Sequence, residues 1–102
     1  MGYGNLAKMA QQMQAEMARV QAEIAELSLE GTAGGGAVKA LVNGHGELVS
    51  LTIDPDVVDS DDLEMLQDLV TAAVNDGVHK IKQQVDEKTA RVTGGMRIPG
   101  LG

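Results

Sequence analysis

The feature that most constrains this chain is a run of apolar residues near its N-terminus, which recur at alternating spacings of four and three. They are Leu6, Ala10, Met13, Met17, Val20, Ile24 and Leu27. This spacing is the heptad pattern of a helix with one apolar seam, and Gln, Glu and Arg occupy its other faces. The pattern predicts one helix over residues 5–27, about 33 Å long. A single domain of this size does not need so long a helix, so we expect part of it to project.

Composition limits the core that 102 residues can build. The chain has no Phe, Trp or Cys, and Tyr3 is its only aromatic residue. Small aliphatic side chains bury little area each, and a second copy of the chain would supply the missing contact. The lack of cysteine excludes disulfides and fits a reducing cytoplasm. No apolar run is long enough to span a membrane, and the N-terminus does not resemble a signal peptide.

After the first helix the helical period is lost, and Val, Thr, Ile and Gly become frequent. This change predicts three short strands, over residues 27–32, 37–43 and 47–53. A tight turn centred on Gly44 and His45 would place Val38 opposite Leu51, whereas a three-residue loop would place it opposite Thr52. The pairing of apolar residues favours the tight turn.

The stretch "LVNGHGELV" places His45 between two glycines, which raises the question of a metal ligand or a catalytic base. Gly44 and Gly46 are expected to supply positive φ, and His45 to lie on an exposed turn. A metal site needs more ligands, and the only other histidine, His79, falls in a predicted helix. A general base needs an orienting partner and a pocket, and the sequence shows neither. We therefore expect no metal site.

A second long helix is predicted over about residues 61–90, after Pro55 ends the third strand. Ser60, Asp61 and Asp62 are candidate N-caps, and Asp61 and Glu64 have the spacing of a capping box. The apolar stripe of this helix is Leu66, Val70, Ala73, Val74, Gly77, Val78, Ile81 and Val85.

Two small residues of that stripe, Ala73 and Gly77, are four apart, which predicts a close approach by another helix. Residues 1–92 are expected to form a single domain. Residues 93–102 are rich in Gly and include Pro99, which predicts a flexible tail.

Three other motifs suggest chemistry but fit it poorly. In "DPDVVDSDD" an EF-hand loop would need Gly and Glu where the chain has Asp59 and Met65. The glycines of "GTAGGGAVK" precede a predicted strand, and not the helix of a phosphate loop. "GYG" follows no strand, so it is not a dinucleotide fingerprint. No Ser/His/Asp set is evident, so we expect neither an enzyme nor a cofactor or small-molecule substrate.

Charge is segregated along the chain, although its net value is −7. Residues 54–76 contain eight acids and no base, whereas residues 80–97 contain five bases and two acids. If the helices pack antiparallel, Lys8 lies near Lys88 and Arg91, with Arg97 in the adjoining tail. Such basic tips could contact phosphate. The alternative is ordinary solvated charge with partners four residues apart, as in Asp76–Lys80, Lys82–Asp86 and Glu87–Arg91. In the first helix, Arg19 and Glu23 have the same spacing.

Four segments together resemble the YbaB/EbfC family of bacterial nucleoid-associated proteins: "NLAKMAQQMQAEM", "GGGAVKALVNGHGELVSLTIDP", "DLEMLQDLVTAAVNDG" and "VTGGM". The resemblance implies an α+β fold with a long helix, a three-stranded antiparallel sheet and a second long helix. It also implies a tweezer-like homodimer, joined through the sheet region, whose projecting helices bind duplex DNA with little sequence preference. The DNA-binding positions it implies are Lys8, Lys82, Lys88, Arg91 and Arg97.

One departure from this expectation is that the first helix carries only Lys8 and Arg19 as bases. An acidic protein with so few bases would bind DNA weakly or with the help of a partner. The leading hypothesis is a cytoplasmic, nucleoid-bound homodimer that organises the chromosome or regulates genes. The alternative is a protein-interaction scaffold of the replication or recombination machinery, which grips a partner helix through the seam and its methionines.

Overall fold

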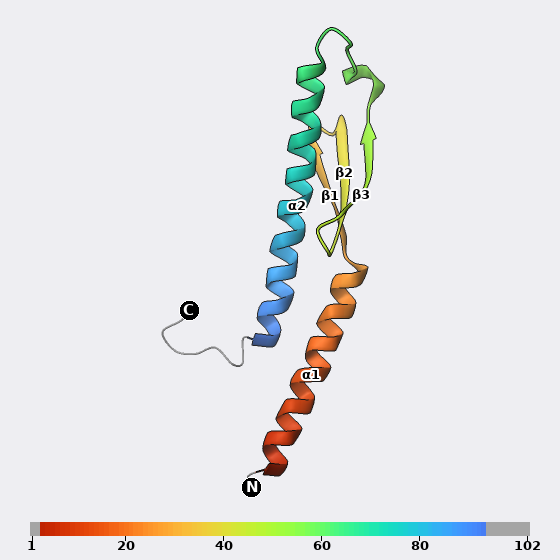
Figure 1. Ribbon diagram of the computed structural model, residues 1–102. Helices are drawn as coiled ribbons and strands as arrows, with labels where there is room; N and C mark the ends of the chain where they lie inside the picture. Colours follow the sequence, from red (N-terminus) through yellow and green to blue (C-terminus); the bar gives the residue numbers. More distant parts are fainter. Residues whose placement is uncertain (1–2, 94–102) are drawn as a thin grey trace, which may run out of the picture.

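The computed structural model describes residues 3–93 and shows two long helices and a three-stranded sheet (Figure 1). The elements in chain order are α1 (Tyr3–Glu26), β1 (Ser28–Ala33), β2 (Val38–Asn43), β3 (Leu48–Ile53), the short 3-10 helix η1 (Pro55–Val57) and α2 (Leu63–Thr93). This α-β-β-β-α order confirms the expected α+β fold. The expected tail, apart from Thr93 at the end of α2, lies outside the described residues.

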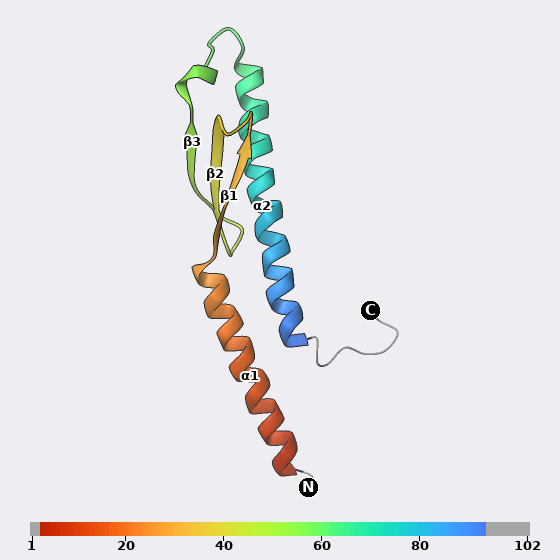
Figure 2. The ribbon, with the colours of Figure 1, turned by 180° about the vertical axis from the view of Figure 1, so that it is seen from behind.

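The sheet is antiparallel with strand order β1-β2-β3, and α2 lies along one of its faces (Figures 1 and 2). Alternate residues of the central strand, Val38, Ala40 and Val42, are fully buried. Val38 and Ala40 form a core cluster with Ala73 of α2. Because a strand turns successive side chains to opposite faces, this alternation places the core between β2 and α2.

The β2–β3 register differs from the predicted one: Val38 pairs with Ile53, and Ala40 with Leu51. The prediction of a tight two-residue turn was therefore wrong. The turn has three central residues, 44–46, and is closed by the Asn43 backbone N–H, which donates to the Glu47 carbonyl at 3.0 Å. A β-bulge next to Leu41 and Val42 shifts the pairing by one further residue.

The side chain of Asn43 explains why the wider turn is preferred. Its Oδ1 accepts the backbone N–H groups of His45 and Glu47, both at 3.0 Å. Gly46 has a φ of 80°, as expected, but Gly44 does not have a positive φ. Gly44 is instead required by space, because a Cβ there would lie 1.9 Å from the carbonyl oxygen of Ile24. His45 is exposed on the turn, as predicted.

The helix α2 begins at Leu63, after a cap made by Asp62. The Asp62 Oδ1 atom accepts the backbone N–H of Met65 at 3.1 Å, which satisfies one of the free donors of the first turn. Of the three candidate caps, Asp62 is therefore the one used. The Asp61 backbone N–H donates to the side chain of Asp59, in the turn before the helix.

The small residues of α2 face the sheet, and the prediction that another helix approaches them was wrong. A Cβ on Gly31 of β1 would lie 2.1 Å from the backbone nitrogen of Gly77 and 2.2 Å from the carbonyl oxygen of Ala73. The spacing of Ala73 and Gly77 did indicate close packing, but its partner is a strand.

The C-terminal part of α1 packs against the free end of α2, and its N-terminal part extends beyond the end of α2 (Figures 1 and 2). Val20 and Ile24 of α1 form a buried cluster with Val92 of α2. All the described side chains of residues 4–15 are exposed, and Leu6 retains 63% of its accessible surface. The expectation that part of the first helix projects is confirmed, and half of its apolar seam is uncovered.

Candidate nucleic-acid interface

The cations predicted to contact DNA lie on two helices at different heights. Lys8 is exposed on the projecting part of α1, and Lys82 and Arg91 are exposed on α2. Lys88 is half-buried on α2, and Arg97 lies outside the described residues. Within residues 3–93, the side chains of Lys8, Lys82 and Arg91 form no ion pair, which leaves their charges available to an external anion.

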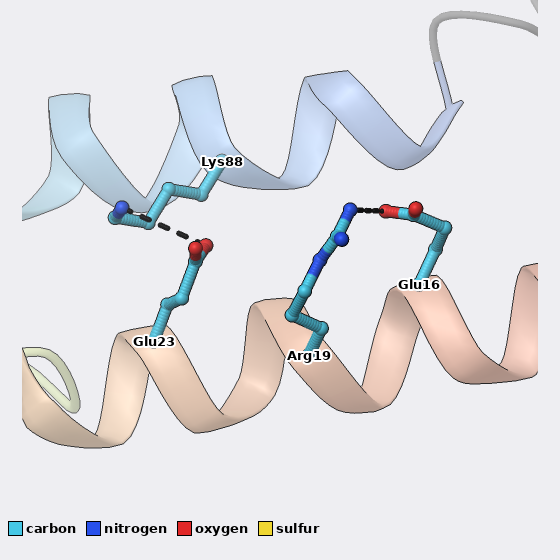
Figure 3. Close-up of polar contacts among 4 residues, drawn as sticks. All are labelled: Glu16, Arg19, Glu23 and Lys88. Carbon is cyan, nitrogen blue, oxygen red and sulfur yellow. Dashed lines mark hydrogen bonds and ion pairs between the residues drawn. The ribbon is translucent and has the colours of Figure 1, made fainter.

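Lys88 faces α1 and is engaged by one of its acids (Figure 3). Its Nζ lies 3.8 Å from Oε2 of Glu23, and only 18% of its side chain is exposed. In its own helix, Lys88 has no acid three or four residues away. A partner on the facing helix can be predicted only when the register between the two helices is known, and the sequence alone does not provide that register.

The structure does not bring Lys8 to Lys88. Glu23, the neighbour of Lys88, lies fifteen residues along α1 from Lys8, which corresponds to about 22 Å of helix. The reason is the packing of Val92 against Val20, which sets the end of α2 beside the middle of α1. The expected group of Lys8, Lys88 and Arg91 therefore does not form within one protomer.

The ion pairs predicted along the helices are found only in part. Lys80 and Asp76 pair at 3.0 Å, as expected. Arg19 pairs with Glu16, and not with Glu23 as its spacing suggested (Figure 3). The other two predicted pairs, those of Lys82 and Arg91, are not seen among the described residues.

Two residues of α2 cover the outer edge of β1. The Asp76 carboxylate accepts the Thr32 backbone N–H at 2.9 Å, and the Lys80 ammonium donates to the Glu30 carbonyl at 3.1 Å. The hydrogen bond from Thr32, followed by that from Lys80, holds the pKa of Asp76 below its ordinary value. These contacts occupy backbone groups that an edge strand otherwise offers to another strand.

The opposite edge of the sheet differs from that of β1. In the described residues β3 pairs only with β2, so its other edge is unpaired. Three of its apolar side chains, Leu48, Val49 and Leu51, keep 47%, 57% and 38% of their accessible surface. An unpaired edge with apolar side chains is a surface on which another chain can add.

A shallow hollow of about 280 Å³ lies between the β2–β3 turn and α2. It is lined by Gly44, His45, Gly46, Val78, Ile81, Lys82 and Val85. Its wall is mainly apolar and contains no carboxylate, so it offers no acid and base pair for catalysis. Over residues 3–93 no three His, Asp or Glu side chains gather as metal ligands would. No helix in that range has the length and hydropathy needed to cross a membrane.

Comparison with known proteins gives concordant matches over almost the whole chain. The model of the YbaB/EbfC DNA-binding family matches residues 1–96. A nucleoid-associated protein of Thermoanaerobacter pseudethanolicus is 52% identical over 97 residues, which are 95% of this chain and 87% of that protein. A nucleoid-associated protein of Moorella thermoacetica is 50% identical over 104 residues, covering 99% of this chain and all of its own.

The fold also matches a solved structure. The crystal structure of an uncharacterized protein from Helicobacter pylori superposes with a TM-score of 0.66 at 28% sequence identity. The match covers 94% of this chain and 97% of the other. The arrangement of two long helices and a three-stranded sheet is therefore shared with a protein of known structure.

Proposed function

Because this chain belongs to the YbaB/EbfC DNA-binding family, we propose that it binds duplex DNA as a homodimer with little sequence preference. It is a nucleoid-associated DNA-binding protein, like the relatives it matches. In this proposal it acts in the cytoplasm, on the nucleoid, and contributes to chromosome organisation or gene regulation. Its activity is binding without a catalytic step.

The proposed dimer is joined through β3. Side chains of α2 cover the edge of β1, so β3 is the edge left for a second copy. Pairing of two β3 strands about a two-fold axis would extend the sheet and cover Leu48, Val49 and Leu51 in both protomers. It would also supply the apolar contact that a chain of small side chains lacks. Both pairs of helices would then project from a shared sheet.

The proposed DNA surface is the set of cations on the helices, and its supporting observation is that Lys8, Lys82 and Arg91 are exposed and form no ion pair within residues 3–93. Lys88 and Arg97 complete the set. A dimer would present about ten such charges, and roughly five phosphate contacts would give log K a slope of about −4.5 against log salt.

The acidic residues between positions 54 and 76 determine which end of the molecule DNA approaches in this proposal. Residues 54–76 begin at η1 and continue into the first half of α2, at the end of the molecule opposite to the free ends of the helices (Figure 1). Phosphates are repelled there and attracted toward the second half of α2. Between residues 3 and 93 no short recognition helix follows a tight helix turn, so contacts to the DNA backbone and to its shape should dominate.

The alternative function, a protein-interaction scaffold, is favoured by one observation. The seam of α1 continues past α2 with Leu6 and Met13 exposed, and Met9 lies exposed next to it on the same helix. A partner helix could cover these side chains, as in a coiled coil. Salt separates the two functions, because phosphate binding weakens as ionic strength rises whereas apolar docking persists.

The test is a gel-shift titration across salt with duplexes of unrelated sequence, run beside sedimentation. Lys82→Glu is expected to weaken binding about tenfold at low salt while the dimer persists. The control is Lys39→Glu, since Lys39 on β2 is also an exposed lysine without an ion pair within residues 3–93. If Lys82→Glu and Lys39→Glu weaken binding equally, the proposal that DNA binds the cations of the helices is contradicted. Binding that is insensitive to salt would favour the scaffold.

A further inference from the structure

We propose that Glu23 is an internal competitor of DNA phosphate for Lys88. In the free protein Glu23 holds the Lys88 ammonium beside α1, and phosphate has to displace it before Lys88 can contact DNA. This inference rests on the proposed function, because it concerns the cations of the same surface.

The geometry is that of a loose ion pair, in which Lys88 can exchange Glu23 for another anion. The distance of 3.8 Å between Nζ and Oε2 exceeds that of a hydrogen-bonded ion pair, which is about 2.7–2.9 Å. Figure 3 shows the two side chains approaching each other across the space between the helices. A lysine ammonium sits on a flexible four-carbon stem and is not fixed in a planar fork as a guanidinium is. Lys88 can therefore turn from Glu23 to an external anion without a change in the backbone.

The exposure of Glu23 favours this exchange. The Lys88 side chain is 18% exposed, which makes Lys88 the more buried partner. The Glu23 side chain is 42% exposed and retains access to water. When Lys88 leaves, Glu23 becomes solvated, so no unpaired charge remains buried. A fully buried acid would lose far more, and would hold its lysine permanently.

Competition of this kind lowers the affinity below the value that a count of lysines suggests. Lys88 lies in the sequence between Lys82 and Arg91, which form no ion pair within residues 3–93. With Glu23 beside it, Lys88 adds no net charge to that surface. The attraction of the pair to phosphate is then weaker than that of a free lysine.

Glu23→Gln removes the competing charge and keeps the size of the side chain. We expect it to raise the affinity for duplex DNA several-fold at low salt. We also expect the slope of log K against log salt to steepen by about 0.9 for each new phosphate contact. Circular dichroism and sedimentation verify that the variant keeps its helices and its oligomeric state.

The matched control is Glu26→Gln, which removes the same charge from the same helix. Glu26 is exposed and forms no ion pair within residues 3–93. A double-variant cycle completes the test, because Glu23→Gln should give no gain beyond that of Glu26→Gln when Lys88→Gln is also present.

Two results would overturn the competition: a gain for Glu23→Gln no larger than that for Glu26→Gln, or a gain that persists with Lys88→Gln. In either case the wild-type chain still binds DNA with salt dependence, and the proposed function stands. If neither the wild-type chain nor the variants bind duplex DNA, the proposed function fails and the competition fails with it.

Discussion

Gly31 of β1 and Gly77 of α2 meet backbone to backbone, and neither position has room for a side chain. A Cβ on Gly31 would lie 2.1 Å from the Gly77 nitrogen, and one on Gly77 would lie 2.7 Å from Cγ2 of Val42. Both residues are buried. This contact sets the distance between helix and sheet, and therefore the direction in which α2 leaves the sheet toward its free end.

Gly31→Ala should destabilise the fold by about 3 kcal/mol or more, because the methyl group would clash with main-chain atoms that cannot move alone. Gly4→Ala is the matched control, since a Cβ on Gly4 of α1 meets nothing within 4 Å. That change should stabilise the helix slightly, because Ala is the better helix former. Thermal unfolding at a fixed protein concentration measures both. A Gly31→Ala variant as stable as the wild type would contradict the packing described.

Asp76→Asn keeps an oxygen for the Thr32 N–H but removes the negative charge that attracts Lys80. We expect it to lower the midpoint of thermal unfolding near pH 7. Because the pKa of Asp76 is lowered in the folded protein, its carboxylate stabilises the fold above the ordinary pKa of 3.8. That contribution is lost as the pH falls through the folded-state pKa. The wild type and the variant should therefore converge in acid, and a difference that stays constant down to about pH 2 would argue against this role.

Val49→Lys should break the proposed dimer, because it places a charge on the unpaired edge of β3. Val58→Lys is its control: Val58 has a similar exposure, 53% against 57%, but lies after η1 and outside the strand. Sedimentation should show monomers for the first variant at concentrations where the second remains dimeric. If both variants remain dimeric, β3 is not the joining edge.

Asn43→Ala removes the carbonyl oxygen that accepts the N–H groups of His45 and Glu47. The loss should cost about 1 kcal/mol of unfolding free energy, the usual net value of a hydrogen bond of this kind. Asn75→Ala serves for comparison, since Asn75 is exposed on α2 and Ala favours the helix. Chemical denaturation compares the two, and equal stabilities would contradict the role of Asn43 in the turn.

Local patterns predicted the elements well because their causes are local. The heptad run predicted a helix over residues 5–27, and α1 covers residues 3–26. Each end of the three strands lies within one residue of its predicted position. The cap of α2 was among three adjacent candidates, of which only Asp62 has its oxygen beside the right N–H group.

Errors arose where a side chain or a distant element decided the outcome. The β2–β3 register followed from Asn43, whose side chain stabilises a wider turn than apolar pairing alone would favour. Gly44 was assigned a positive φ, but its real constraint is the carbonyl of Ile24 in another element. In the same way, Lys88 pairs with Glu23 of the facing helix. Which residue of α1 lies opposite Lys88 depends on how Val92 packs against Val20.

The uncovered part of α1 has a consequence for how such a chain can vary. Its side chains from residue 4 to 15 are all exposed, so the folded core imposes no length on it. Adding or removing one heptad would move the tip by about 10 Å and restore nearly the same facing. The length by which α1 projects can therefore change in steps of one heptad, while the sheet and α2 keep their structure.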